Sequence, residues 1–374
     1  MKPKIGTLTI DRFRAFRHLK IDGLGRVNLI TGRNNTGKSS VLEALRILAS
    51  DGSPSVMHSI LRYREEEAGE ADESARPLDS EGIFLFSTLF NGFPQFSDQL
   101  KEIVIATNDG QPMRVAVKAV WLSEERGEDG TRRLVPKQRE LFGTAEPIPG
   151  LFIEAAGNRR IFPLDYARHS HSYGGRWIPS DILGKANLPC VFVSPYGGER
   201  TTTLGALWDK IALSDREKDV VEALRIIDPE ISAVSMVGEG TRERRTAIVR
   251  ANNLPCPVLL RSYGDGLNRL FGIVLSLVNA KDGILLVDEF ENGMHHTVQL
   301  DAWRAIFRLA QKLDIQVFAT SHSWDSIEAF QKAAAETPEE GVLVRLSRKG
   351  EDIIATVFAE DELAIVARER IEVR

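Results

Sequence analysis

The fold is decided by one stretch near the N-terminus, residues 27–40, which reads VNLITGRNNTGKSS. Its first residues are apolar and favour a strand, and Gly32 to Ser39 match the pattern G-x-x-x-x-G-K-[ST]. The next residues, 41–48 (VLEALRIL), have the apolar spacing of a helix. Strand, glycine-containing loop and helix in this order predict a loop whose backbone N–H groups surround phosphate groups at a helix N-terminus.

The residues of this loop have separate expected tasks. Lys38 is expected to reach the β- and γ-phosphates and to assist catalysis, and the Ser39 hydroxyl is expected to bind Mg²⁺. We predict ATP as the nucleotide, because residues 279–282 (NAKD) lack the Asn-Lys-x-Asp order that reads guanine. The expected nucleotide-binding residues of the loop are Gly32, Asn34, Asn35, Thr36, Gly37, Lys38, Ser39 and Ser40.

Two adjacent carboxylates follow a second apolar strand, residues 283–289 (GILLVDE). Such a strand delivers Asp288 and Glu289 to the edge of the sheet beside the phosphate loop. We expect Asp288 to hold Mg²⁺ and Glu289 to polarise the attacking water as a catalytic residue. A strand that ends in solvated acidic residues is the alternative.

Two further segments are candidates for phosphate contacts. His322 ends the strand-like run VFATSH and is predicted to sense the γ-phosphate as a third catalytic residue, with a helix cap or surface residue as the alternative. Ser262, Gly264 and Gly266 precede an apolar helix, where a hydroxyl and N–H groups can bind a phosphate. A tight turn with an N-cap is the alternative there.

Strand and helix patterns alternate through the C-terminal half of the chain. Strands are expected at 191–193, 247–249, 258–260, 284–287, 315–319, 342–347 and 352–358. Helices are expected at 203–213, 215–227, 265–280, 297–312 and 324–335, and at the C-terminus. The alternation predicts an α/β fold with a mixed, mainly parallel sheet flanked by helices, and residues 5–30 add an N-terminal antiparallel β portion.

The character of the sequence changes between residues 51 and 185. Residues 62–81 are rich in charge and poor in bulky apolar side chains, which favours a loop or lid, whereas 115–121 and 151–154 are strand-like. We therefore predict a single ATPase domain over residues 1–374. Its core lobes are 1–50 and 186–374, and 51–185 form a mixed α+β insertion.

The order of these elements resembles the ABC-type ATPase plan of the Rad50/SMC/RecF and OLD (overcoming lysogenization defect) proteins. Residues 287–295 (VDEFENGMH) are similar to the DEPENGLHP segment of the OLD-like branch, and 11–16 (DRFRAF) to its opening. The resemblance covers 5–50 and 188–330. It implies a P-loop NTPase of ABC-ATPase type in which two domains sandwich ATP head to tail.

In that arrangement Ser262, Gly264 and Gly266 of one subunit would contact the γ-phosphate bound by the other, and Asn292 and Gly293 would lie at the dimer interface. The sequence departs from the pattern at two places. Residues 262–266 read SYGDG rather than LSGGQ, and residues 194–196 (SPY) occupy the place of the Q-loop glutamine. We expect no TOPRIM nuclease domain in the short stretch after His322.

Composition limits the partners and the cellular location that we expect for the chain. A net charge of -5 argues against binding nucleic acid through bulk charge, so loop clusters such as Arg132-Arg133 are expected to be solvated, with DNA contacts as the alternative. No apolar run reaches the ~20 residues of a membrane span. The two cysteines lack metal-ligand spacing, as expected of reduced thiols in a cytoplasmic protein.

Three functions are compatible with the sequence. The leading one is an ATPase dimer or higher oligomer that controls a separately encoded effector, a TOPRIM-type nuclease or a toxin, in prokaryotic anti-phage defence. The second is a RecF- or Rad50-like ATP-dependent DNA-binding protein of repair or recombination, although no long coiled coil is predicted. The third is a nucleotide-binding switch with negligible turnover.

Overall fold

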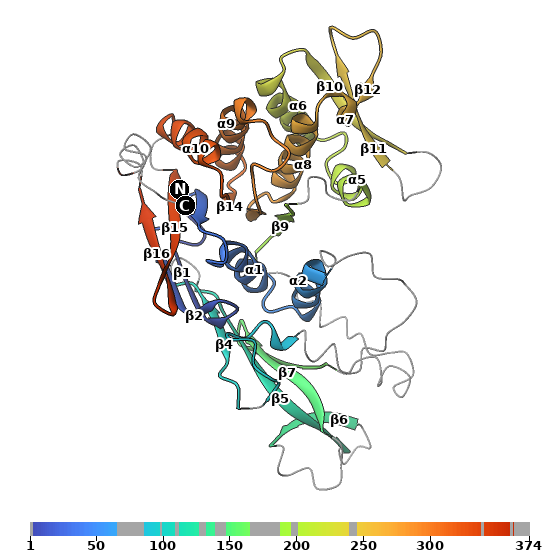
Figure 1. The fold of residues 1–374 in the computed structure, drawn as a ribbon. Coiled ribbons are helices and arrows are strands. Elements are labelled where there is room, and N and C mark those ends of the chain that lie inside the picture. The colour runs from blue at the N-terminus through green and yellow to red at the C-terminus, as the bar shows by residue number, and fades with distance from the viewer. Residues whose placement is uncertain are drawn as a thin grey trace.

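The chain of 374 residues is described by a computed structural model (Figure 1). The described residues are 3–65, 86–97, 99–108, 112–126, 132–138, 147–164, 188–195, 201–238, 245–337, 340–359 and 362. Among the helices of these residues, none has the length and apolar character needed to cross a membrane.

A mainly parallel sheet forms the centre of the fold, with strand order β16-β15-β3-β14-β13-β9. Neighbouring strands are parallel except β15 and β16. The carboxyl ends of β3, β13 and β14 therefore meet at one edge, where the phosphate loop, Asp288-Glu289 and His322 follow. The strands are β3 (Val27–Gly32), β9 (Cys190–Val193), β13 (Ile284–Val287), β14 (Gln316–Thr320), β15 (Gly341–Lys349) and β16 (Asp352–Phe358).

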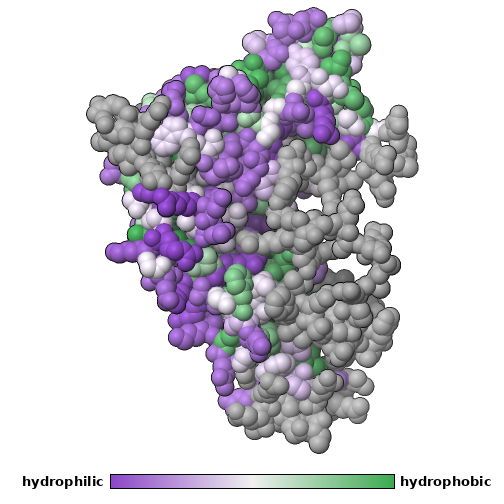
Figure 2. Space-filling model, in the orientation of Figure 1, coloured by the Kyte–Doolittle hydropathy of each residue, from purple (hydrophilic) through white to green (hydrophobic). Residues whose placement is uncertain are grey.

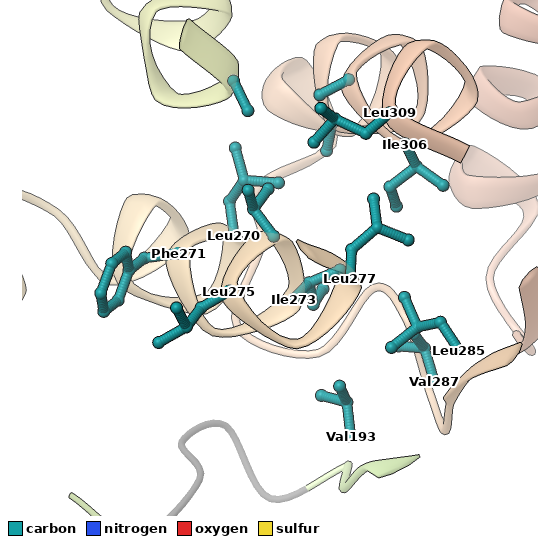
Figure 3. Packing of buried hydrophobic residues seen from close by; sticks show 14 of the residues in the cluster. Val193, Leu270, Phe271, Ile273, Leu275, Leu277, Leu285, Val287, Ile306 and Leu309 are labelled. Carbon is teal, nitrogen blue, oxygen red and sulfur yellow. The ribbon is translucent and has the colours of Figure 1, made fainter. Parts of the chain in front are cut away.

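Helices cover one face of this sheet and form the larger core (Figure 3). Because side chains alternate along a strand, Leu285 and Val287 point into this core, whereas Ile284 and Leu286 point into the core of the opposite face. The helices on the first face are α5 (Thr201–Asp209), α6 (Asp215–Ile227), α7 (Leu260–Tyr263), α8 (Asp265–Asn279), α9 (His296–Lys312) and α10 (Trp324–Ala335).

The opposite face is covered by α1 (Lys38–Ala49), α2 (Pro54–Glu65) and an antiparallel sheet of order β2-β1-β4-β5-β7-β8, with β6 beside β5. Strand β4 pairs with β1, so the strands between residues 103 and 163 continue the N-terminal sheet. These strands are β1 (Thr7–Phe13), β2 (Phe16–Asp22), β4 (Ile103–Ala106), β5 (Arg114–Arg126), β6 (Arg132–Lys137), β7 (Ile148–Ala155) and β8 (Asn158–Pro163).

A small antiparallel sheet lies at the far end of the helical layer, with order β10 (Ile231–Gly238), β11 (Arg245–Ala251) and β12 (Val258–Leu259) (Figure 1). The surface in Figure 2 is largely hydrophilic over the described residues, and hydrophobic residues gather at this end. Val237 and Leu259 of this sheet are among the exposed large hydrophobic side chains.

The fold class predicted from the sequence is confirmed, and most predicted elements occur within a few residues of their expected bounds. The predicted helix 203–213 is α5, which ends earlier, at Asp209. Sequence reasoning missed α2, β4, β6 and β10. Most of the expected lid at 62–81, Tyr196 of the Q-loop position and the terminal helix beyond residue 362 lie outside the described residues. The division into lobes and insertion stays a prediction.

Candidate functional site

The phosphate loop, Gly32 to Ser39, turns sharply between β3 and α1. Gly32 has a φ of 143°, and a Cβ at this position would lie 2.4 Å from the Leu346 carbonyl oxygen. Gly37 has a φ of 85°, and its Cβ would lie 2.6 Å from the Phe16 ring. Both positions therefore require glycine. Helix α1 begins at Lys38, within the last two residues of the loop, so the positive potential of its N-terminal end is directed at the loop.

Lys38 is folded back over this loop. Its ammonium group donates to the carbonyl oxygens of Gly32 at 2.8 Å and Arg33 at 3.2 Å. Burial lowers the pKa of Lys38, and the nearby carboxylates of Asp288, Glu289 and Glu291 act in the opposite direction. Asn34 and Asn35 at the loop tip are exposed, whereas Thr36 and Ser40 are buried. Lys38 thus holds a position from which its contacts can be exchanged for phosphate oxygens.

Ser39 and Asp288, the two residues expected to hold the metal, lie side by side. The Ser39 hydroxyl donates to Asp288 Oδ1 at 3.1 Å, and the Thr320 hydroxyl donates to the same oxygen at 2.5 Å. Asp288 is 6% exposed, and this burial raises its pKa, while the two hydroxyl groups act against the rise. A hydroxyl and a carboxylate beside a phosphate loop fit Mg²⁺, which takes few protein oxygen atoms and completes its shell with phosphates and water.

Replacing Asp288 by asparagine is expected to stabilise the nucleotide-free protein. Since the folded-state pKa is raised, the ionised carboxylate reduces stability progressively as pH rises through that pKa, and the amide removes this cost while keeping an acceptor for both hydroxyls. We expect Tm at neutral pH to rise by about 1–4 °C, while the extra rise caused by Mg²⁺ with ATP is lost. Thermal unfolding with and without Mg²⁺-ATP measures both. A lower Tm without nucleotide would contradict the assigned cost of burial.

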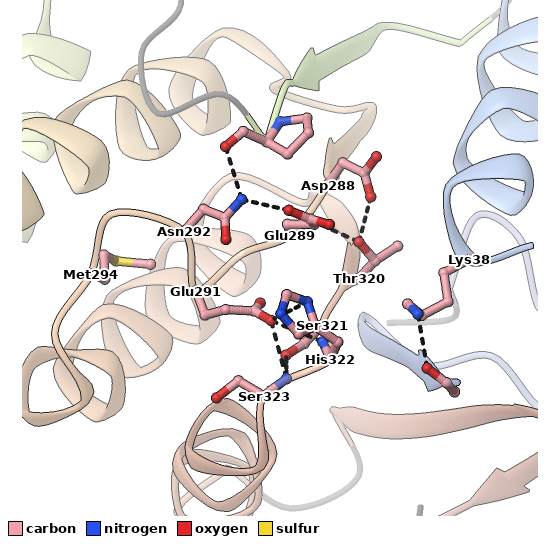
Figure 4. Close-up of polar contacts among 12 residues, drawn as sticks. Lys38, Asp288, Glu289, Glu291, Asn292, Met294, Thr320, Ser321, His322 and Ser323 are labelled. Carbon is pink, nitrogen blue, oxygen red and sulfur yellow. Dashed lines mark hydrogen bonds and ion pairs between the residues drawn. The ribbon is translucent and has the colours of Figure 1, made fainter. Parts of the chain in front are cut away.

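Glu289 is placed by an unusual backbone conformation. Its φ is 47°, a left-handed value that is strained for a residue with a side chain. Its N–H donates to Thr320 Oγ1 at 2.8 Å, and Asn292 donates to Glu289 Oε2 at 2.5 Å and to the Pro195 carbonyl at 3.1 Å (Figure 4). The carboxylate is thereby fixed beside Asp288 (Figure 4).

His322 follows β14 on the same edge, with about half of its side chain exposed. Its Nδ1 lies 3.1 Å from Glu291 Oε1, and the same oxygen accepts the backbone N–H groups of His322 and Ser323. Figure 4 shows this group next to Glu289, with Lys38 across the site. The structure therefore gathers Lys38, Ser39, Asp288, Glu289 and His322 at one place.

Arg269 ties helix α8 to this edge from behind. It is 3% exposed and donates to the carbonyl oxygens of Ser194 at 2.6 Å and Asp288 at 3.2 Å. The ends of β9 and β13 are thus joined to the helix that begins beside Gly264.

The segment Ser262 to Gly266, here called the signature segment, is not gathered with the other residues. Ser262 is exposed, and Gly264 and Gly266 are half-buried. A Cβ on Gly266 would lie 3.9 Å from Met294 Cα, and Figure 4 shows Met294 on the opposite side of the carboxylates from Lys38. The signature segment of this chain therefore lies away from its own phosphate loop.

Sequence reasoning missed the roles of Thr320, Glu291 and Arg269 in holding the site. Thr320 directly follows the predicted strand 315–319, and its place just before Ser321-His322 was the available signal. Glu291 lies within the 287–295 segment, whose sequence assigns it no contact. Arg269 had no signal, because a charged residue in an apolar helix pattern does not specify which carbonyl groups it meets.

Two known protein families match parts of this chain. Residues 4–107 match the family described as "AAA ATPase domain", and residues 208–327 match "AAA domain, putative AbiEii toxin, Type IV TA system". The two matches contain the phosphate loop, the acidic pair and His322.

The chain is a P-loop ATPase.

The ATPase is similar to a Helicobacter pylori protein called "ATP/GTP phosphatase", with 23% identity over 349 residues, 89% of each chain. An uncharacterized Methanocaldococcus jannaschii protein is 50% identical over 46 residues, 12% of this chain and 21% of that protein.

Among solved structures, the SMC head bound to the C-winged helix domain of ScpA has a TM-score of 0.51 and 12% identity, covering 96% of this chain and 99% of that one. An SMC head with an extended coiled coil, bound to the C-terminal domain of ScpA derived from Pyrococcus furiosus, has a TM-score of 0.50 and 10% identity, covering 98% and 99%. The ATPase thus has the fold of SMC heads.

Proposed function

We propose that two copies of this ATPase close head to tail around ATP and Mg²⁺, and that hydrolysis controls a separate effector protein. The observation that carries the proposal is the position of the signature segment. Ser262 is exposed and Gly266 lies beside Met294, away from Lys38 of the same chain. A second copy, turned by a two-fold axis, brings its signature segment to the phosphate loop of the first.

Within each composite site the residues have distinct tasks. Lys38 leaves the loop carbonyls and binds the β- and γ-phosphates. Ser39 and Asp288 would hold Mg²⁺, which neutralises charge on the phosphates when bound. Glu289 orients and polarises the water that attacks the γ-phosphorus, the bond to the β,γ-bridging oxygen breaks, and ADP is the leaving group. His322 donates a hydrogen bond to the γ-phosphate oxygens as charge develops there.

The proposed setting is a prokaryotic anti-phage system in which a TOPRIM-type nuclease or a toxin is the effector. The resemblance of residues 287–295 to the OLD-like branch supports it. The family matched by residues 208–327 is described as a putative toxin of a type IV TA system, which also favours a multicomponent system. Co-purification of the full chain with the product of a neighbouring gene tests this setting, and a chain that binds no such product contradicts it.

The second candidate function is ATP-dependent DNA binding of the RecF or Rad50 kind. The SMC-head fold favours it, while the net charge of -5 counts against it. DNA binding by the purified chain alone, dependent on ATP and steeply weakened by salt, would support this candidate over the first.

Subunit complementation tests the head-to-tail site. We expect Lys38→Ala and Ser262→Arg to be inactive separately, because each removes one half of both sites, and Ser262 is exposed enough to accept arginine without disturbing the fold. In an equal mixture, half of the dimers are mixed and each has one intact site. ATPase activity should therefore recover to about a quarter of the wild-type value.

The matched control is a mixture of Lys38→Ala with Glu289→Gln. Both defects lie on the same half of the site, so no mixed dimer has an intact site and activity should stay at the level of the separate variants. The shared site would be contradicted if ATPase activity recovered in this control mixture. It would also be contradicted if activity did not recover in the mixture of Lys38→Ala with Ser262→Arg.

A further inference from the structure

Glu291 is a buried carboxylate to which neither the sequence pattern nor the proposed chemistry gives a task. It lies two residues beyond Glu289 and is 9% exposed. Its Oε1 accepts the N–H groups of His322 at 2.9 Å and Ser323 at 3.1 Å, and lies 3.1 Å from His322 Nδ1. One oxygen thus contacts the backbone and the ring of the same histidine.

The backbone of this loop needs such an anchor. Strand β14 ends at Thr320 and α10 begins at Trp324, so the N–H groups of residues 322 and 323 belong to neither element. The side chain of Ser323 makes no capping bond to α10. Without Glu291, the His322 N–H would lose its acceptor and the Ser323 N–H would keep only the Ser321 hydroxyl, at 3.1 Å, so the turn would be held less firmly.

The contact also fixes the ring. A carboxylate accepts and does not donate, so it requires the proton of the imidazole on Nδ1. The ring is then held with Nε2 directed away from Glu291. The neighbouring residue on the same turn, Asn292, holds the Glu289 carboxylate at 2.5 Å. One turn therefore supports both side chains proposed to act at the γ-phosphate.

We propose that Glu291 is a positioning residue that orients His322. It accepts a hydrogen bond from Nδ1–H, so that Nε2 faces the γ-phosphate and donates to it once the ring carries a second proton. This inference rests on the proposed role of His322 in hydrolysis. Glu291 itself touches neither nucleotide nor water in this mechanism; it acts through the histidine.

The orientation is tested without activity by NMR of the imidazole groups, with the His322 signal assigned by its absence in His322→Ala. In the nucleotide-free wild type we expect the proton on Nδ1. In Glu291→Ala we expect a shift towards the Nε2-protonated form. Glu291→Gln keeps an amide oxygen as acceptor and should give an intermediate result, which guards against loss of folding in the alanine variant. An unchanged His322 signal in both variants would overturn the proposal.

Kinetics then test whether the effect passes through the histidine. Glu291→Ala is expected to lower kcat by about tenfold to a hundredfold, with KM for ATP within about twofold. In a His322→Ala background the same change should alter kcat by less than about twofold, because partners that act as one unit are not additive. Additive losses would assign Glu291 a general structural role and overturn the proposal.

Two further variants distinguish a failure of the proposed role of His322 from a failure of the proposed role of Glu291. If His322→Ala keeps wild-type kcat, the proposed role of His322 fails, whereas the imidazole signal still decides whether Glu291 positions the ring. Glu336→Gln is the matched control: this glutamate is exposed and pairs with Arg304 at the far end of α10. It should leave kcat and the His322 signal unchanged.

Discussion

Replacing Glu289 by glutamine is expected to lower the kcat of ATP hydrolysis by about 10²- to 10³-fold while ATP still binds. Glutamine has nearly the same shape and can keep the bond from Asn292, but it cannot polarise the attacking water as a carboxylate does. The left-handed backbone at Glu289 and its bond to Thr320 are independent of the side-chain charge, so the site geometry is retained.

Steady-state turnover and nucleotide affinity of the two proteins provide the measurement. Because hydrolysis is blocked after assembly, the variant should also accumulate the ATP-bound dimer, which sedimentation or light scattering detects. Equal turnover in the variant and the wild type would remove Glu289 from the proposed mechanism. It would also restore the third alternative, a switch with negligible turnover.

The central sheet could be predicted because its signals are local. One apolar strand ends at Gly32 and another ends just before Asp288. Because β3, β14 and β13 pair in parallel, the carboxyl ends of these strands meet at one sheet edge, and this brings the phosphate loop and the acidic pair together. The positions of Ser39 beside Asp288 and of His322 near Glu289 follow from this topology. Bounds such as β13 at 284–287 and α10 at 324–335 match for the same reason.

The rest of the fold depends on pairings that a single sequence does not specify. Strand β4, with only four residues, is defined by its pairing with β1, and β10 by its pairing with β11. The sequence pattern therefore does not predict that the N-terminal strands and β4 to β8 form one continuous antiparallel sheet. Strands of this kind are recognised from their partners rather than from their own residues.

Individual side-chain hydrogen bonds show the same limit. Ser214 and Glu217 fit a helix-capping pattern, yet the Ser214 hydroxyl donates to the Ile211 carbonyl and only Glu217 reaches back, to the Leu213 N–H. Glu291 likewise belongs to a segment that is recognisable as a whole, but its partner is a histidine in the loop after β14. Spacing locates such residues, whereas their hydrogen bonds depend on how the strands are placed.

Replacing Lys38 by alanine is expected to have the largest effect, a fall in kcat/KM of about 10³-fold or more, because binding and hydrolysis both lose the same cation. This loss of activity is not expected to come with a loss of folding stability. Burial lowers the pKa of Lys38, so the charged ammonium reduces the stability of the nucleotide-free fold at neutral pH. Its bonds to the Gly32 and Arg33 carbonyls offset part of that cost.

Thermal unfolding of the Lys38→Ala variant should therefore show a nucleotide-free Tm close to that of the wild type, while the rise in Tm at saturating Mg²⁺-ATP disappears. Lys332→Ala is the matched control, since Lys332 is an exposed lysine paired with Glu328 on α10, and its response to Mg²⁺-ATP should be unchanged. A Lys38→Ala variant that keeps the Mg²⁺-ATP response would show that the phosphates bind elsewhere. In that case the folded-back ammonium would be a structural contact of the loop, and the composite site around it would have to be abandoned.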